Sequence, residues 1–492
     1  MKEALKLIQE IQKEVFLLHG VIALLDWDEK TYMPKKGIGS RSEQVSIINS
    51  LAHKKIVSNE LFKTLKKLSK KKLSKKDSII VKRLLKDVID ARKLPQKFVE
   101  ELSKESIITS GIWQKARKEN DFEIFKLALK KMINLKRKQA KYINPKAEAY
   151  DVLIDNHEEG MTAKKLTEIF TPLKKELIKI LKDIKKTKQY KAQKHHHIKI
   201  SEEEQKNLVK LFVEKMSVSW DVLSLDASAH PFTTRISEYD VRITTRFPDL
   251  MDAFFSTVHE AGHALYELNL PKEYAPTVIY EAPSMGIHES QSRFWENMIC
   301  RNKVFWKGYF KTFNKTAKQK VTSEEFYNWI NLVRPSYIRV DADEVTYCLH
   351  IILRFEIERD LINGKLSVDN ARDEWNKKFK EMFGITPKSD NQGILQDIHW
   401  SMGAFGYFPS YAIGTIYSSQ IRAKLKQEIK DFDSLVERQE FKKIILWLEK
   451  NIHSKGRTML ADEIIKKSTG KGLDPESYIK YLKDKYSKIY GF

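Results

Sequence analysis

Apolar residues recur at helical spacing along most of the chain. The pattern i, i+3, i+4, i+7 runs through 61–68, 121–143, 166–186 and 441–456. Alternation typical of a strand is confined to DVRITTRF at 240–247, and a short apolar run, TVIY, stands at 277–280. These patterns predict a mostly α-helical protein with a small β-sheet.

The helical pattern continues without a clear domain boundary. No stretch rich in Gly, Ser and Pro divides the chain, and no internal repeat is evident. We therefore expect one domain over residues 1–492, with the polar segment 185–205 as a candidate flexible segment. Within it, His195, His196 and His197 are adjacent, and adjacent histidines on a flexible segment cannot converge on one ion. We expect them to face solvent.

The segment STVHEAGHALYEL (256–268) contains a candidate metal site. On an α-helix, His259 and His263 lie one turn apart on the same face, where both imidazoles can reach one Zn²⁺ ion. Glu260 follows the first histidine, which places it beside the metal as a base rather than as a ligand. The alternative is three polar residues that share an ordinary helix by chance. The apolar residues around the motif favour the helix, and the helix brings the two histidines together.

A catalytic zinc ion needs a third protein ligand. The continuation HExxHxxGxxH is absent, because Tyr266 and Asn269 stand where its glycine and histidine would be. A downstream glutamate is the alternative, and spacing alone does not choose among those present. We select Glu289, which we expect in the first turn of a second helix that begins near 284–287, and keep Glu281 and Glu296 as alternatives.

The chain is strongly basic, with a formal net charge of +23. Lysine runs could follow the phosphates of a nucleic acid, but apolar residues lie beneath them at helical spacing, which favours a solvated surface. The two cysteines, Cys300 and Cys348, form no CxxC pair. With no signal-peptide pattern and no apolar run of membrane-spanning length, we expect a cytoplasmic protein without a membrane or nucleic-acid partner.

Eight segments together carry a family resemblance. In chain order they are LLDWDEKTYMPKKGIGSRSEQ (24–44), YDVLIDNHEEGMT (150–162), HPF (230–232), DVRIT (240–244), HEAGH (259–263), HESQS (288–292), IRVDAD (338–343) and GILQDIHW (393–400). On these motifs the sequence resembles the carboxypeptidase Taq family of cytosolic metallocarboxypeptidases over almost its whole length.

The resemblance implies the fold and the metal centre. The fold is a single, almost all-helical body in which two lobes flank a deep groove, similar to angiotensin-converting enzyme and neurolysin. One divalent ion per chain, Zn²⁺ with Co²⁺ or Mn²⁺ as alternatives, would be held by His259, His263 and Glu289. Family members are typically homodimers.

The resemblance also implies the reaction. A zinc-bound water would attack the peptide bond with Glu260 as general base, and C-terminal amino acids would be released from peptides with broad specificity. A zinc oligoendopeptidase on the same fold is the nearest alternative. A basic, helical nucleic-acid-binding protein is a distant one.

The family motifs contain candidates for substrate binding. Arg339 and Arg242 could hold the C-terminal carboxylate, since a guanidinium binds carboxylates bidentately; alternatively, each pairs with a nearby aspartate. His399, Tyr407 and Tyr411 are candidates to stabilise the oxyanion, with aromatic packing as the alternative.

Three further motif residues are candidates for supporting roles. His230 could limit substrate length at one end of the groove, or it could belong to a capped turn before Pro231. Asp343 and Asp397 could orient a ligand histidine.

Overall fold

Helices make up most of the structure. The computed structural model describes residues 1–194 and 196–492, so His195 of the predicted exposed histidines lies outside the described residues. The α-helices are α1 (Lys2–Thr31), α2 (Ile38–Ile56), α3 (Asn59–Leu68), α4 (Lys75–Lys93), α5 (Gln96–Glu119), α6 (Phe122–Ile143), α7 (Ala149–Asp155), α8 (Ala163–Lys186), α9 (Lys188–Ala192), α10 (Glu202–Lys215), α11 (Leu250–Leu268), α12 (Met285–Arg293), α13 (Lys303–Ala317), α14 (Ser323–Ile330), α15 (Glu344–Ile362), α16 (Ala371–Phe383), α17 (Phe408–Glu428), α18 (Phe432–Arg438), α19 (Lys442–Asn451), α20 (Ala461–Thr469) and α21 (Glu476–Tyr490). The strands are β1 (Leu223–Ala227), β2 (Thr233–Ser237) and β3 (Asp240–Thr245). The mostly α-helical fold with a small sheet is confirmed.

Three of the four segments with helical periodicity fold as one helix each. They are 61–68 in α3, 121–143 in α6 and 166–186 in α8. The fourth, 441–456, is divided between α19 and a 3₁₀ helix at His453–Thr458. Gly456 adopts a φ of 45° there, which an α-helix does not accommodate.

Residues 185–205 connect α8 to α10 through the short helix α9. His196 stacks on the ring of Trp329 with centroids 3.6 Å apart and is only partly exposed, whereas His197 is exposed and lies 3.2 Å from the carboxylate of Asp249. The expected solvent exposure is therefore right for His197 and wrong for His196, because an aromatic partner covers one face of its ring.

The small sheet packs against α11, the helix that carries the HEAGH motif. Its order is β1–β3–β2, with β1 parallel and β2 antiparallel to β3. β3 confirms the strand predicted at 240–247. The apolar run at 277–280 is a turn instead, because the N–H groups of Thr277 and Tyr280 each donate to a carbonyl three residues earlier.

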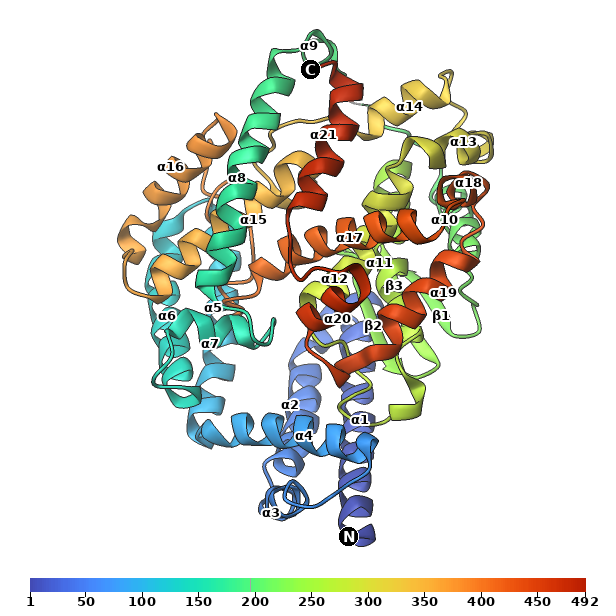
Figure 1. The fold of residues 1–492 in the computed structure, drawn as a ribbon. Coiled ribbons are helices and arrows are strands. Elements are labelled where there is room, and N and C mark those ends of the chain that lie inside the picture. Colours follow the sequence, from blue (N-terminus) through green and yellow to red (C-terminus); the bar gives the residue numbers. More distant parts are fainter. Residues whose placement is uncertain (195) are drawn as a thin grey trace.

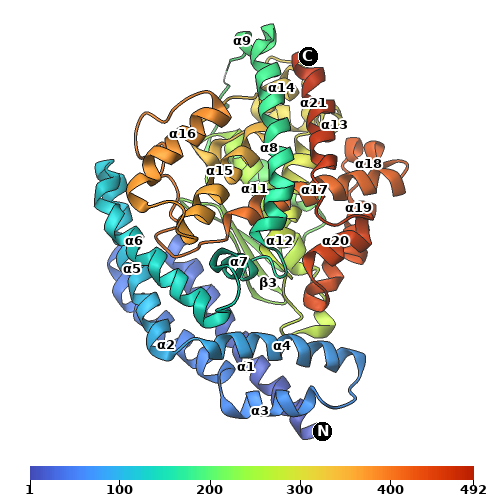
Figure 2. The same cartoon turned by 60° about the vertical axis from the view of Figure 1, so that its left-hand side comes forward.

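The centre of the molecule is formed by α11, α12 and α17 (Figure 1). The N-terminal helices α1 to α4 lie together at one end, and α8 and α21 pass over the outside of the central helices (Figure 2). None of the helices in the described part of the chain is long and apolar enough to cross a membrane. The division into two lobes stays a prediction.

Candidate metal centre

The HEAGH motif lies in the second half of α11. This helix begins after Asp249, whose side chain accepts the N–H groups of Met251 and Asp252. Most of its other side chains are buried, so tertiary packing holds its orientation. The helix presents His259, Glu260 and His263 to a cavity of about 1230 Å³, which is the predicted groove.

Two glycines let α12 lie unusually close to its neighbours. A Cβ atom on Gly262 of α11 would be 2.8 Å from the carbonyl oxygen of Gln291, and one on Gly414 of α17 would be 2.7 Å from the Cβ of Glu289. Contacts this short leave no room for a side chain at either position unless α12 shifts. α12 therefore fits between α11 and α17. This close packing fixes the position of Glu289 along α11, opposite the two histidines.

Three donor atoms converge between α11 and α12. Glu289 Oε2 lies 3.5 Å from Nε2 of His259 and 3.4 Å from Nε2 of His263, and all three donors are within 4.8 Å of one another. Two donors about 2.1 Å from an ion at the tetrahedral angle are roughly 3.4 Å apart, so this spacing fits a four-coordinate ion with one open position. The helix beginning predicted at 284–287 is confirmed, although Glu289 stands in the second turn of α12 rather than the first.

The charges around the triad favour a cation. Burial by itself would lower the pKa of His259, but Glu289 and Glu296 outweigh burial and raise that pKa to about 10. Burial likewise opposes the charge on Glu289, but Arg293 holds its pKa well below the usual range. Arg293 Nε donates to Glu289 Oε1 at 2.7 Å, which leaves Oε2 directed at the histidines. The set of two imidazoles and one carboxylate is a donor set that zinc prefers.

The outer nitrogen of each histidine has its own partner. His259 Nδ1 lies 2.9 Å from Glu296 Oε2, so Glu296, one of the alternative ligands, stands behind a histidine rather than beside the triad. His263 Nδ1 lies 2.6 Å from His288 Nδ1. His288 Nε2 in turn lies 2.7 Å from Glu267 Oε1. Such contacts fix which nitrogen of each ring faces the metal.

Asp343 and Asp397 do not fill the orienting role expected for them. Asp343 caps the N-terminus of α15, and Asp397 binds two arginines instead of a ligand histidine. The other alternative ligand, Glu281, lies 3.4 Å from Arg457 and is not part of the triad. Helix capping and ion pairing account for these three carboxylates.

Glu260 is held close to the triad but is not part of it. Its side chain is only 7% exposed, and Thr233 of β2 donates its hydroxyl proton to Glu260 Oε2 at 2.6 Å. Burial raises the pKa of Glu260. A buried carboxylate with a raised pKa at the edge of a cavity is suited to accept and return a proton near neutral pH.

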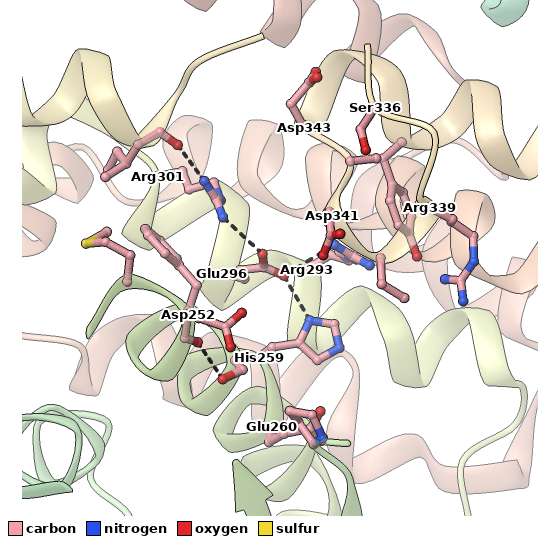
Figure 3. A pocket seen from close by; sticks show the side chains of 18 of the residues that line it. Asp252, His259, Glu260, Arg293, Glu296, Arg301, Ser336, Arg339, Asp341 and Asp343 are labelled. Carbon is pink, nitrogen blue, oxygen red and sulfur yellow. Dashed lines mark hydrogen bonds and ion pairs between the residues drawn. The ribbon is translucent and has the colours of Figure 1, made fainter. Parts of the chain in front are cut away.

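Of the two candidate arginines, only Arg339 lines the cavity. In Figure 3, Arg339 lies at one side of the pocket, Arg301 and Asp252 lie at the other, and His259 and Glu260 lie between them. Arg339 is 7% exposed, and both its Nε and its Nη2 donate to Asp397 Oδ1, at 3.0 and 2.8 Å.

Arg242 is engaged elsewhere. It makes a bidentate pair with Asp240 at 2.9 and 2.8 Å and stacks over the Trp27 ring, outside the cavity lining. The ion-pair alternative therefore applies to Arg242, because its preferred partner is two residues away on the same strand. His230 is exposed and accepts a hydrogen bond from Ser228 at its carbonyl oxygen, as in the capped-turn alternative; its neighbours from Pro231 onward line the cavity.

Tyr407 and Tyr411 line the cavity, whereas His399 lies behind them. His399 Nε2 is 3.2 Å from the Tyr411 hydroxyl, and burial lowers the pKa of His399 to about 3, so its ring is neutral. The structure also adds Tyr347, a cavity residue whose buried hydroxyl meets no hydrogen-bond partner in the part of the chain that is described.

The sequence interpretation did not identify four residues at this centre: Thr233, His288, Arg293 and Tyr347. His288 and Arg293 flank Glu289 on α12 and would be found by projecting that helix once Glu289 is taken as a ligand. Thr233 and Tyr347 come from elements distant in sequence, and only the fold brings them to the cavity.

Comparison with known proteins points to one family. Residues 7–486 match the family described as carboxypeptidase Taq (M32) metallopeptidase. Carboxypeptidase 1 of Bacillus subtilis (strain 168) is 35% identical over 488 residues, covering 98% of this chain and 97% of that protein. Thermostable carboxypeptidase 1 of Pyrococcus furiosus is 36% identical and covers 98% of each chain. The crystal structure of an M32 carboxypeptidase from Deinococcus radiodurans R1 is similar with a TM-score of 0.96 at 33% identity, and the match covers 100% of both chains.

Proposed function

The chain belongs to the carboxypeptidase Taq (M32) family of metallopeptidases, and from that premise we propose that it releases single amino acids from the C-termini of peptides with broad specificity. Metal-dependent carboxypeptidase activity follows from the family. The roles of individual residues are our proposal. The observation that carries the proposal is that the three metal donors share a cavity with Arg339. This arginine is buried, and one of its side-chain nitrogens has no partner among the described residues.

His259, His263 and Glu289 would hold one divalent ion, which we take to be Zn²⁺. When bound, such an ion lowers the pKa of a water molecule and polarises a peptide carbonyl. Glu260 accepts the proton of the attacking water and passes it to the leaving amine, and Thr233 keeps its carboxylate turned toward the cavity. Hydroxyl groups of Tyr407 and Tyr411 are placed to donate to the developing oxyanion.

Charge balance around Asp397 supports the recognition of a C-terminal carboxylate. One carboxylate is shared by two guanidinium groups, since Arg354 Nε also donates to Asp397, at 2.6 Å. The trio of Arg339, Arg354 and Asp397 is buried and carries a net charge of +1. Arg339 is the member of this trio that lines the cavity. Asp397 occupies Nε and Nη2 of Arg339, and no residue in the described ranges pairs with Nη1. A substrate carboxylate would neutralise this charge, whereas an amide would not.

Other parts of the proposal concern partners and location. Peptides are the substrates, a second copy of the chain completes a homodimer, and no nucleic acid is bound. Both cysteines are unpaired and buried, which is compatible with action in the reducing cytoplasm.

The test is hydrolysis of an N-blocked dipeptide and of its C-terminal amide by wild type and Glu260→Gln, with metal content measured on the same samples. We expect cleavage of the free acid only, with a rate lower by about 10²- to 10⁴-fold in the variant while the metal stays bound. Equal cleavage of the amide would instead indicate an oligoendopeptidase.

A further inference from the structure

The segment 150–162 belongs to the family resemblance, yet the metal centre does not use it directly. It forms α7 and the loop that leads into α8. In that loop Glu158 is only 2% exposed, although it is a carboxylate with no Lys or Arg within ion-pair distance among the described residues. A buried carboxylate without a cation is costly and calls for an explanation from its contacts.

One set of contacts caps the helix that carries Glu289. The N–H of Met285 donates to the carbonyl oxygen of His157 at 3.1 Å, and the N–H of Gly286 donates to Glu158 Oε1. These N–H groups belong to the first turn of α12, where no partner exists within the helix. A carboxylate at a helix N-terminus is also favoured by the helix dipole.

The contact between Glu158 and the first turn of α12 requires a glycine at position 286. A Cβ atom at that position would lie 2.8 Å from Glu158 Oε1 and 2.7 Å from Cγ2 of Ile413 on α17. The absence of a side chain lets the carboxylate, the first turn of α12 and α17 meet at one point.

A second set of contacts reaches the wall of the cavity. Ser410 of α17 donates its hydroxyl proton to Glu158 Oε1 at 2.7 Å, and the His157 ring packs edge-on against Tyr407 with centroids 5.1 Å apart. Ser410, Tyr407 and Met285 all line the substrate cavity. The loop therefore contacts α12, which carries the ligand Glu289, and α17, which carries the cavity residue Ser410.

We propose that Glu158 is a positioning residue whose carboxylate holds the first turn of α12 against α17, and so fixes Glu289 relative to Ser410 and Tyr411. This inference rests on the proposed peptidase function. Glu158 touches neither substrate nor metal, and it acts through the two helices that do.

The ionisation of Glu158 decides how well it can hold these helices. Burial raises its pKa to about 7, against the opposing effect of the hydroxyl groups of Ser410 and Ser284 and the N–H of Gly286. Among the described residues, the titratable group that interacts with it is Tyr417 on α17; from the start of α12 it is faced by the Ser284 hydroxyl and the N–H of Gly286, neither of which is charged. The ionised carboxylate accepts all three donors, whereas the protonated form must itself donate and loses its attraction to the helix N-terminus. We call these contacts of the ionised carboxylate the Glu158 clamp. All of them are made above about pH 7, and they weaken below it as the carboxylate is protonated.

The test compares Glu158→Gln with wild type from pH 5.5 to 8.5. The amide has the shape of the protonated acid, so we expect kcat at pH 8.5 to fall about tenfold with KM changed less than about threefold. The ratio of the two kcat values should approach one toward pH 5.5, where wild type is itself protonated. The zinc dissociation constant at pH 8.5 should rise about threefold to tenfold.

Thermal stability separates positioning from a loss of fold. Because the folded-state pKa of Glu158 is raised, the ionised carboxylate destabilises the fold at pH 8.5, and the amide should leave Tm unchanged or higher. The matched control is Glu356→Gln, which removes a carboxylate that joins α15 to Lys174 and Lys378 away from the cavity. It should lower Tm without changing the zinc dissociation constant.

A kcat ratio that does not vary with pH, or an activity loss that only follows a fall in Tm, would overturn the proposal. If wild type cleaves no peptide, the proposed function fails instead. The zinc affinities of the two proteins would still test the clamp in that case.

Discussion

Replacing Arg339 with methionine removes the guanidinium at the cavity surface while keeping an unbranched, largely apolar side chain in its place. Asp397 keeps its bond from Arg354 at 2.6 Å, so the buried carboxylate is not left without a cation. The net charge of the trio changes from one positive charge to none. We therefore expect the protein to fold, with its metal triad intact, and to lose the charge that distinguishes a C-terminal carboxylate from an amide.

The size of the loss follows from the contacts. A hydrogen bond to a charged group contributes about 1.5–3 kcal/mol, and the unpaired Nη1 of Arg339 is available for one such bond. This corresponds to roughly 10- to 150-fold in kcat/KM for a free-acid substrate. Any residual rate on the matching amide should not change, because the amide never gains from that charge.

The assay measures kcat/KM for an N-blocked peptide acid and for its amide with wild type, Arg339→Met and Arg242→Met. Arg242 is the matched control, since it is also a motif arginine paired with an aspartate but lies outside the cavity. We expect the acid-to-amide preference to collapse in Arg339→Met and to persist in Arg242→Met. An unchanged preference in Arg339→Met, or its loss in Arg242→Met, would refute the assignment.

Two further predictions concern the scaffold of the site. Gly262→Ala places a Cβ atom 2.8 Å from backbone atoms of α12, so we expect about 1–3 kcal/mol lower unfolding free energy and weaker zinc binding, measured by urea denaturation and chelator competition; unchanged zinc affinity would argue against the close helix contact. Lys485→Met leaves Glu344 buried beside Tyr481 and Tyr486 without its cation. Burial lowers the pKa of Lys485 to about 8, so the change should cost about 3–5 kcal/mol in urea denaturation at pH 6, where the lysine is charged; a loss below about 1 kcal/mol would contradict it.

The sequence predicted those features that depend on local spacing. Helical periodicity indicated the mostly helical fold and located α3, α6 and α8, and the i, i+4 spacing of His259 and His263 placed both rings on one face of α11. The second predicted helix brought Glu289 to them, and the geometry is compatible with that choice. Nothing local distinguished β1 and β2 as strands, because their pairing depends on β3.

Contacts between distant segments were beyond the reach of the sequence. Arg339 and Arg242 look alike in their motifs, but the partner of Arg339 is 58 residues away and that of Arg242 is two residues away. Glu296, the outer partner of His259, likewise lies 37 residues away in the chain. The apolar run at 277–280 resembles a strand in sequence, because four residues are too few to distinguish a buried strand from a buried turn.

The most direct test of the account is digestion of an unblocked heptapeptide by metal-free protein to which Zn²⁺ is added back stepwise, with products identified by mass spectrometry. We expect a ladder of products shortened one residue at a time from the C-terminus, at a rate that saturates at one equivalent of metal per chain. Internal fragments, or a full rate without metal, would contradict the account.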